Sequence, residues 1–297
     1  MNNAAGGNRV CVFGEVLFDE FPDGAKVLGG APFNVAWNLQ ALGEAPVLVS
    51  GVGNDERGDE VIAAMQQWGM SLEAMQRDSK RPTGRVTVAF ENGEPAYEIQ
   101  QNCAYDAISK PSIDPCRLLY HGTLALRSAP SAVTLDSLRD EHDGLVFVDV
   151  NLRSPWWQAD SVESLLGHAH WVKLNEQELH LLAAESGQLD AVMESFAARY
   201  GLQGLVVTCG EQGARALTPD GGLLTVRPQD NVVVTDTVGA GDAFSAVCLI
   251  GLLHAWPLHT TLQRAQSFAA RVVGQRGATT RSRAFYEAAR LGWEQGG

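Results

Sequence analysis

Apolar and polar positions follow two alternating periods along most of the chain. Short apolar runs, typical of buried strands, are followed by segments in which apolar residues recur at helical spacing. Strands are predicted at residues 10–14, 46–51, 117–121, 145–150, 170–174, 205–209 and 231–234. Helices are predicted at residues 32–42, 58–68, 131–139, 176–184, 191–200, 243–254, 262–274 and 283–291. This alternation favours an α/β fold, with a mostly parallel sheet covered by helices on both faces.

Two segments interrupt the alternation and predict a second, smaller sheet. Residues 85–101 alternate apolar and polar positions on either side of Asn92-Gly93, which is typical of a β-hairpin. Residues 16–27 are extended and turn-rich, and no helix fits them. We therefore expect a small β-sheet lid formed by about residues 15–28 and 84–106.

The rest of the sequence shows no repeat and no low-complexity linker, so a single domain over residues 1–297 is expected. Residues 214–227 are predicted to form a hairpin at an antiparallel edge of the main sheet. The apolar lid residues Val86, Val88 and Phe90 would stay partly in contact with water in a monomer. Exposed faces and edges of this kind tend to be covered, which predicts a homodimer through the lids.

Charge and hydropathy narrow the choice of partners. The chain has 22 Lys and Arg against 35 Asp and Glu, a formal charge of −13, which argues against binding nucleic acid or an anionic membrane surface. The longest apolar run, residues 246–253, is shorter than the roughly 18 residues that span a bilayer. Residues 1–8 lack the apolar core of a signal peptide, so a cytoplasmic protein is expected. The five cysteines are spread without a C-x-x-C pair, and four or five of them are expected to be reduced thiols, most of them buried in strands and helices.

The strongest chemical signal is the run Asp-Thr-Val-Gly-Ala-Gly-Asp-Ala-Phe at residues 236–244. It follows a predicted strand and opens a predicted helix, and its glycines allow a tight turn with outward-facing amides. A helix N-terminus favours an anion, and Asp242 in the first turn would stand beside it as a proton acceptor. An anion cradle with an adjacent base suits phosphoryl transfer to an alcohol. The alternative is an ordinary glycine-rich turn in which Asp242 caps the helix.

Two other nucleotide motifs are absent from this turn. The dinucleotide-binding pattern G-x-G-x-x-G fails because Phe244 stands where the third glycine is needed. The P-loop pattern fails because the sequence contains no Gly-Lys pair, and the last of the lysines is Lys173. A nicotinamide oxidoreductase is therefore disfavoured, and phosphoryl transfer would proceed without a P-loop lysine.

The run at residues 236–242 resembles the C-terminal signature of the ribokinase-like (PfkB) carbohydrate kinases. Gly-Gly-Ala-Pro-Phe-Asn-Val-Ala at residues 29–36 resembles the N-terminal signature of the same family, in the family order. Residues 14–19 and 149–153 further resemble the fructokinase branch. The resemblance covers essentially the whole chain. It implies a ribokinase-like three-layer α/β/α sandwich with a β-sheet lid, and the activity of an ATP-dependent sugar kinase.

The resemblance also assigns roles to residues. Asp242 would be the catalytic base, beside an anion hole formed by Gly239, Ala240 and Gly241. The sugar would be bound by Asp19, Gly29, Gly30 and Asn34. ATP would be bordered by Asn175, Thr208, Gly210, Glu211, Gly213 and Gly241. Water-mediated Mg²⁺ binding is implied for Glu178, and a K⁺ site for Asp236, Val238 and Gly277.

For several of these residues the sequence leaves a second interpretation open. Asn175 and Glu178 also fit a capping box at a helix start. Arg153, which follows a strand at the ligand-binding edge of the sheet, fits either a phosphate or sugar contact or a surface salt bridge. Asp19 could be a solvated charge of the lid, and Gly29-Gly30 a simple turn into a helix.

The predicted reaction is transfer of the γ-phosphoryl group of ATP to a primary hydroxyl, with fructose as the first choice of substrate. 2-Keto-3-deoxygluconate, ribose and nucleosides are the other candidates, and a non-catalytic sugar or nucleotide sensor on the same fold is the alternative from another class. Substrate choice is expected to rest on residues in or near the lid: Asp19, Phe33, Tyr97, Gln100, Asn102 and Tyr105.

Overall fold

The structure is a computed structural model that describes residues 7–91, 94–228 and 234–295. The strands of its main sheet are β1 (Gly7–Phe13), β4 (Val47–Gly53), β5 (Met75–Asp78), β8 (Cys116–His121), β9 (Leu145–Asp149), β10 (Trp171–Asn175), β11 (Gly204–Thr208), β12 (Ala214–Leu217) and β13 (Leu223–Val226). Their spatial order is β13-β12-β11-β10-β9-β8-β1-β4-β5. Neighbours from β11 to β5 are parallel, while β12 is antiparallel to both β11 and β13. The predicted antiparallel edge hairpin is thus confirmed.

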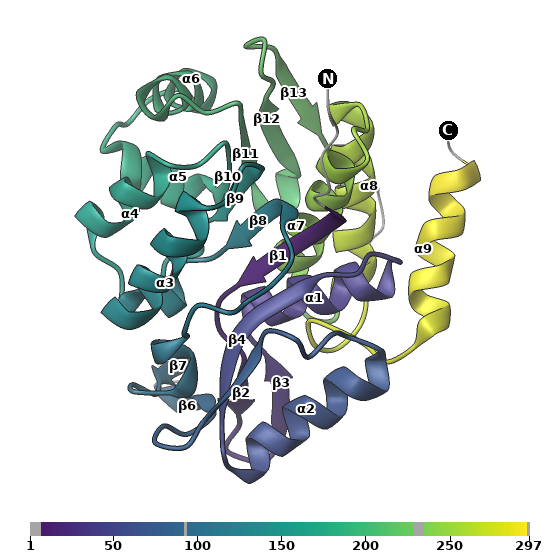
Figure 1. Ribbon diagram of the computed structural model, residues 1–297. Helices are drawn as coiled ribbons and strands as arrows, with labels where there is room; N and C mark the ends of the chain where they lie inside the picture. The colour runs from purple at the N-terminus through teal and green to yellow at the C-terminus, as the bar shows by residue number, and fades with distance from the viewer. Residues whose placement is uncertain (1–6, 92–93, 229–233, 296–297) are drawn as a thin grey trace.

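Helices cover both faces of this sheet, as Figure 1 shows. One layer consists of α1 (Ala31–Ala41), α2 (Glu56–Trp68), α7 (Ala240–Leu253), α8 (Leu258–Val273) and α9 (Arg283–Gln295). The other layer consists of α3 (Ala129–Asp140), α4 (Ala159–Leu166), α5 (Glu176–Ala183) and α6 (Leu189–Tyr200). The predicted three-layer α/β/α arrangement is therefore confirmed.

Strand β1 shows why the buried strands are apolar without interruption. Val10 and Val12 belong to the core beneath α1 and α7, whereas Cys11 and Phe13 belong to the core on the opposite face. Successive side chains of a strand point to opposite faces, so a strand covered on both sides needs apolar residues at every position. This explains why the sequence pattern located the central strands.

A second sheet of four strands lies beside one end of the main sheet (Figure 1). Its strands are β2 (Leu17–Glu20), β3 (Lys26–Gly29), β6 (Gly84–Glu91) and β7 (Glu94–Ile99), in the order β3-β2-β6-β7. Strands β2 and β6 pair in parallel, while β2–β3 and β6–β7 are antiparallel. Both predicted segments therefore contribute to one small sheet.

Two elements of the main layers were not predicted, and one prediction falls outside the described residues. Strand β5 has the polar sequence Met-Gln-Arg-Asp and pairs only with β4 at the sheet edge, so it carries no apolar run. Helix α4 is a short element that the pattern did not reveal. Of the strand expected at 231–234, residues 231–233 lie outside the described residues, as does the turn Asn92-Gly93, and Val234 lies in no strand.

Two of the three apolar lid residues that suggested a dimer are buried within a single chain. Val86 and Val88 are 7% and 4% exposed within a single chain. Val86 packs in the same core cluster as Leu17 and Ile99, because this face of the small sheet is covered by the chain's own residues. The side chain of Phe90 lies outside the described residues. The expectation that Val86 and Val88 would stay partly wet in a monomer was therefore wrong, and the homodimer prediction loses the support of these two residues.

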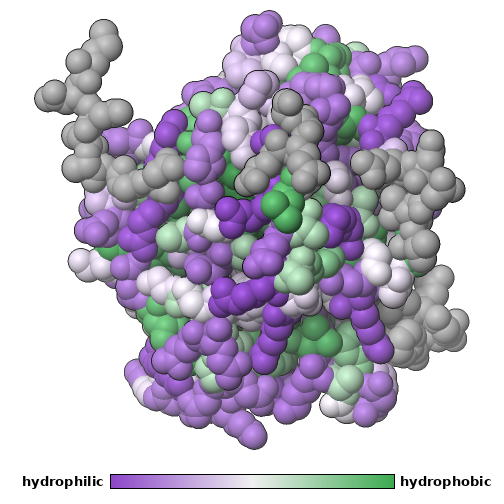
Figure 2. Space-filling view, turned by 90° about the vertical axis from the view of Figure 1, so that its right-hand side faces the viewer, coloured by the Kyte–Doolittle hydropathy of each residue, from purple (hydrophilic) through white to green (hydrophobic). Residues whose placement is uncertain are grey.

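The surface is mainly polar, as Figure 2 shows for one face of the molecule, with apolar residues in small groups. Among the residues that the structure describes, no helix combines the length and the apolar character needed to cross a membrane. All five cysteines are free thiols and four of them are buried, as predicted.

The chain segment after β7 is held by a buried ion pair. Nε and Nη2 of Arg127 lie 2.8 and 2.9 Å from the two carboxylate oxygens of Asp106, and Nη2 also donates to the Gln100 carbonyl at 2.6 Å. The guanidinium lies between the rings of Tyr105 and Trp156, at 5.2 and 5.0 Å from their centroids. These contacts fix the base of the small sheet to the loop that follows β8.

This clamp generates a stability prediction. Asp106→Ala leaves the Arg127 guanidinium buried without its counter-charge, so we expect the free energy of unfolding to fall by about 3–5 kcal/mol. Urea denaturation followed by circular dichroism measures it. The matched control is Glu163→Ala, which removes the 46% exposed partner of the 49% exposed Arg199 and should cost at most about 1 kcal/mol. Equal denaturation midpoints for the two variants would contradict the assigned role of the clamp.

Candidate active site

The predicted site residues gather at the carboxyl edge of the main sheet, where open α/β sheets bind ligands. Arg153 follows β9, and Asn175 and Thr208 end β10 and β11. Asn175 and Thr208 are direct partners in the parallel pairing of these two strands. The topology therefore brings together residues that are far apart in the sequence.

The glycine-rich turn places Asp242 in the first turn of α7. Gly239 precedes the helix with φ +79°, and a Cβ there would lie 2.2 Å from the Cβ of Ala278. Both the backbone and the space therefore require glycine. Within the described part of the chain no side chain caps this helix, so Asp242 is not the cap, and the first-turn amides have no side-chain acceptor there. The turn can thus present amides to an anion, with a carboxylate beside them.

A hydrogen bond joins the two signatures. Nδ2 of Asn34, in the first turn of α1, donates to Oδ2 of Asp242 at 2.8 Å. Asn34 is buried, and its Oδ1 has no hydrogen-bond partner among the described residues. The bond orients the Asp242 carboxylate and leaves an unpaired acceptor on Asn34 for a ligand.

The protonation equilibrium of Asp242 differs from a simple helix-dipole expectation. The helix N-terminus was expected to favour the ionised form, yet the pKa of Asp242 is raised to about 6. Burial is the main cause, with a further increase from the charge of Asp149, and the Asn34 hydrogen bond, Lys173 and Arg153 act in the opposite direction. The carboxylate is therefore still mostly ionised at pH 7 and loses its charge as the pH falls through about 6.

The Gly29-Gly30 turn faces a polar space between β2 and α1. A Cβ on Gly29 would stand 3.7 Å from both Oδ2 of Asp19 and Oδ1 of Asn34. Burial raises the pKa of Asp19 to about 6, so Asp19 is not a solvated lid charge. Gly30 has φ +105°, and a Cβ there would meet the Glu15 carbonyl at 2.8 Å. Asp19, Gly29 and Asn34 thus lie together.

Glu15 belongs to this group, although the sequence analysis gave it no role. It is 4% exposed, and Oε2 has no hydrogen-bond partner among the described residues. The pKa of Glu15 is raised to about 7, mainly by burial and also by the charge of Asp242, while the charges of Arg153 and Arg127 act in the opposite direction. The available signal was a charged residue inside an otherwise apolar run at the end of a strand, which needs a partner when buried.

The side chain of Arg153 is exposed, and its guanidinium forms no hydrogen bond or ion pair with the residues that the structure describes. Its charge nevertheless lowers the pKa of Glu15, Asp19 and Asp242. The surface salt bridge considered as its alternative is therefore not found in the described part of the chain. A free guanidinium instead lies near three carboxyl groups.

Two residues expected to select the substrate are part of the core. Phe33 is fully buried and packs against Trp37, with ring centroids 5.6 Å apart. Tyr105 is fully buried and its hydroxyl accepts a hydrogen bond from Arg127. Tyr97 is 63% exposed, Gln100 is half-buried, and Asn102 binds Arg81. Of the proposed selectivity residues, only Asp19 is shown to share the space beside Gly29.

Asn175 and Glu178 form the capping box that the sequence left open. Oδ1 of Asn175 accepts from the Glu178 amide at 2.8 Å, and Oε2 of Glu178 accepts from the Asn175 amide at 2.9 Å. Oε1 of Glu178 accepts from the Leu152 amide at 2.7 Å. Each carboxylate oxygen keeps one lone pair, which fits contact with Mg²⁺ through its waters better than direct ligation.

The expected nucleotide loop follows β11 as a short, exposed turn. Gly210 and Glu211 are exposed, and Gly210 has φ +55°. Gly213 has φ +92°, and a Cβ there would meet the Val226 carbonyl at 2.1 Å, so this glycine is also required by the packing of the edge strands. Thr208 is half-buried at the start of this loop.

The three residues of the expected monovalent-cation site lie together. Oδ1 of Asp236 accepts from the Val238 amide at 3.0 Å, and Oδ2 accepts from the Gly277 amide at 2.9 Å. The carboxylate thus joins the signature turn to the loop after α8. Carbonyl and carboxylate oxygens in such a junction are the donors that a hard cation prefers.

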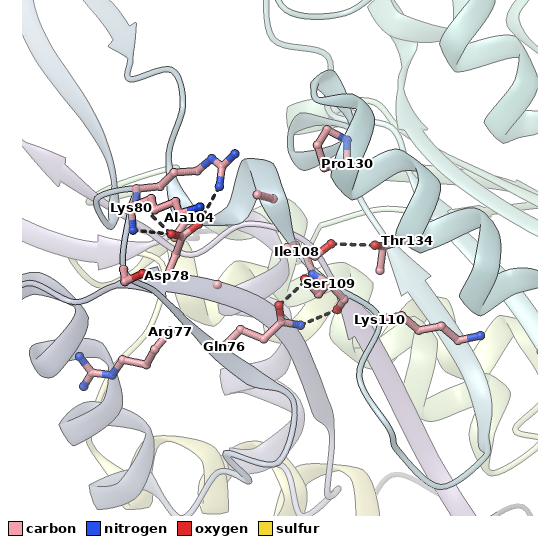
Figure 3. Close-up of a pocket in the computed structure, with 14 residues that line it drawn as sticks. Gln76, Arg77, Asp78, Lys80, Ala104, Ile108, Ser109, Lys110, Pro130 and Thr134 are labelled. Carbon is pink, nitrogen blue, oxygen red and sulfur yellow. Dashed lines mark hydrogen bonds and ion pairs between the residues drawn. The ribbon is translucent and has the colours of Figure 1, made fainter.

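A separate cavity of about 590 Å³ lies between β5, the segment after β7 and α3 (Figure 3). Its polar groups are paired: Gln76 exchanges two hydrogen bonds with Ser109, and the Thr134 hydroxyl donates to the Ile108 carbonyl. None of the candidate active-site residues lines it. This cavity is therefore distinct from the space between Asp19 and Asp242.

Comparison with known proteins identifies the family to which the chain belongs. The family model described as "pfkB family carbohydrate kinase" matches residues 10–284. The chain belongs to this family. The protein is therefore a carbohydrate kinase, and the family resemblance of its two signatures is confirmed.

The relatives support the same branch. The fructokinases of Klebsiella pneumoniae and Salmonella typhimurium are each 30% identical to this chain; the alignments cover 82% and 92% of it, and 84% and 95% of those proteins. A double mutant of the Vibrio cholerae fructokinase, solved with fructose, ADP and potassium, superposes with a TM-score of 0.81 at 26% identity. That match covers 96% of this chain and 99% of the Vibrio chain. The ribokinase-like fold is thereby confirmed.

The turn before α7 generates a prediction about packing. Gly239 and Gly277 have similar φ values, +79° and +83°, but a Cβ would clash with Ala278 only at Gly239, whereas Gly277 has open space. Gly277→Ala should cost roughly 1–2 kcal/mol through backbone strain alone, and Gly239→Ala about 1–3 kcal/mol more. Denaturant unfolding of both variants measures the difference. Equal costs would show that Ala278 does not confine this turn.

Proposed function

We propose that this carbohydrate kinase transfers the γ-phosphoryl group of ATP to a primary hydroxyl of a neutral sugar, with D-fructose giving fructose 6-phosphate as the first choice. The observation that carries the proposal is the Asn34–Asp242 hydrogen bond, which sets an oriented carboxylate at an uncapped helix N-terminus. The fructokinase names of the relatives support fructose as the substrate.

The charge of the candidate sugar site favours a neutral polyhydroxy ligand. Glu15, Asp19 and Asp242 bring three acidic groups together, opposed by the positive charges of Arg153, Arg127 and the buried Lys173. Carboxyl groups accept hydrogen bonds from hydroxyls, whereas a ligand carboxylate would be repelled. The arrangement therefore favours fructose, ribose or a nucleoside over 2-keto-3-deoxygluconate.

The proposed reaction uses Asp242 as general base. A sugar hydroxyl held beside Asp19 and Asn34 gives its proton to Asp242 while its oxygen attacks the γ-phosphorus. The bond from phosphorus to the β,γ-bridging oxygen breaks, and ADP leaves. Amides of Gly239, Ala240 and Gly241 would hold the phosphoryl oxygens, whose charge they stabilise. The proton on Asp242 then returns to solvent.

The nucleotide would lie along the ends of β10 and β11. Asn175, Thr208, Gly210, Glu211 and Gly213 are the residues proposed to border it. Mg²⁺, held through waters by Glu178, would neutralise phosphate charge. K⁺ bound at the Asp236–Gly277 junction is proposed by analogy with the potassium named for the Vibrio cholerae enzyme.

The direct test is ADP release with ATP and a panel of fructose, ribose, 2-keto-3-deoxygluconate and nucleosides. We expect fructose to give the highest kcat/KM. A different best substrate would replace fructose and leave the kinase assignment in place. Sugar binding without ADP release from any member of the panel would favour the sensor alternative.

Asp242→Asn tests the base. The amide keeps the size of the side chain and cannot accept the proton, so kcat should fall by at least about 100-fold, within the usual range for loss of a general base. ATP binding, measured by calorimetry, and the unfolding midpoint should stay close to those of the wild type. Retention of more than a tenth of wild-type kcat would remove Asp242 from the mechanism.

Gly29→Ala tests the location of the sugar. Its methyl group would reach ordinary contact distance from Asp19 and Asn34, so the fold should tolerate it while the space for a sugar hydroxyl is lost. We expect the KM for the sugar to rise tenfold or more, as for a lost hydrogen bond of ~1–3 kcal/mol, with the KM for ATP little changed. Gly292→Ala, which meets no atom within 4 Å, is the matched control. A change confined to the KM for ATP would show that the sugar does not bind beside Gly29.

A further inference from the structure

A buried ion pair lies beneath the first turn of α7. Nζ of Lys173, in β10, is 2.8 Å from Oδ1 of Asp149, the last residue of β9, and the two side chains are 7% and 5% exposed. A Cβ placed on Gly241 would lie 3.5 Å from Nζ. The ammonium group therefore lies directly behind the proposed phosphoryl cradle, on the protein side.

The pair is embedded in further hydrogen bonds. Oδ2 of Asp149 lies 2.6 Å from the Ser245 hydroxyl and 3.2 Å from the Tyr120 hydroxyl. The Ser245 hydroxyl is also 3.0 Å from the Gly241 carbonyl, one residue before Asp242. The network thus connects β8, β9 and β10 to the turn that carries the base.

Stability alone does not explain such a pair. Two charges lose their hydration on burial, and well-packed apolar residues in the same place are often equally or more stable. Here the apolar alternative would also remove the only lysine that lies behind the cradle, in a chain with no P-loop lysine. A role in the reaction accounts for both the position and the burial.

Six groups act on Asp242 from the elements around it. Asn34 donates a hydrogen bond from α1, and the positive charges of Lys173 and Arg153 favour the carboxylate. The negative charge of Asp149 disfavours it, and the carboxyl of Glu15 and the hydroxyl of Tyr120 also interact with Asp242. Lys173 and Asp149 therefore act in opposite directions on the same carboxylate.

We propose that Lys173 is a positioning residue for the transfer, a fixed positive charge that holds the Asp242 carboxylate and the cradle in their working arrangement, with Asp149 as the counter-charge that holds Lys173 in place. The proposal rests on the proposed function, because Asp242 is the base there. It predicts that removing the charge of Lys173 and removing the charge of Asp149 shift the pH dependence of the reaction in opposite directions.

The experiment measures kcat/KM for the best sugar against pH in the wild type, Lys173→Met, Asp149→Asn and the double variant. Tyr120 and Ser245 still donate to Asp149 when Lys173 is absent, so Asp149 stays charged. The acidic limb is the pH range in which kcat/KM falls as Asp242 becomes protonated. Lys173→Met should move the midpoint of this limb upward by about one pH unit or more. Asp149→Asn should move it downward, and the double variant should lie between the two. Ser245→Ala, which removes a contact and no charge, should leave the limb in place.

A purely structural role gives a different result. Lys173→Met and Asp149→Asn would then lower kcat/KM without moving the limb, or move it in the same direction, and either outcome overturns the proposal. If Lys173→Met does not fold, as judged by circular dichroism, Asp149→Asn against Ser245→Ala decides, since only the former should shift the limb. If the wild type phosphorylates no member of the panel, the proposed function fails. Carboxyl NMR titration of Asp242 in wild type and Asp149→Asn then tests the charge coupling alone.

Discussion

The structure depends on keeping several carboxyl groups together where little water reaches them. Glu15, Asp19 and Asp242 converge at the carboxyl edge of the sheet, and burial raises the pKa of each. Burial and neighbouring negative charges raise the pKa of such carboxyl groups, so they become protonated near neutral pH unless hydrogen-bond donors and positive charges lower it. The Asn34 amide, Arg153 and Lys173 supply that opposition, and each comes from a different element. The fold is thus an arrangement that brings the required donors to one place.

In a parallel sheet, short loops are enough to bring these groups together. Each strand ends at the same edge, so one loop per strand suffices to add a polar group. The two helices that begin there, α1 and α7, bring their first-turn side chains into contact as Asn34 and Asp242. The small sheet adds Asp19 from the side through β2 and is fixed at its base by Arg127 and Asp106.

Local patterns predicted those parts of the molecule that local physics determines. Apolar periodicity located the central strands, because a strand buried on both faces must be apolar throughout. It missed β5, whose four residues are mostly polar at a sheet edge. The glycines and Asp242 were found because a tight turn into a helix leaves a recognisable sequence.

Interactions between distant residues were not predictable in this way. The topology determines which groups lie next to the buried residues Glu15, Lys173 and Asp149. No spacing in the sequence predicts these contacts. The helix N-terminus was expected to favour the ionised form of Asp242, yet its pKa is raised, with burial as the largest cause. Val86 and Val88 were expected to be wet, because the sequence does not show which face of the small sheet its own chain covers.

The contact between Gly239 and Ala278 has a consequence for how the family can diversify. The Ala278 side chain occupies the space that a side chain at Gly239 would need, so a larger residue at either position would clash with the other. Substitutions in the loop after α8 are thereby constrained by the signature turn, although the two segments are separated by two helices. We expect these positions to vary together among relatives, and libraries that randomise the loop should hold Ala278 fixed or randomise it jointly with the turn.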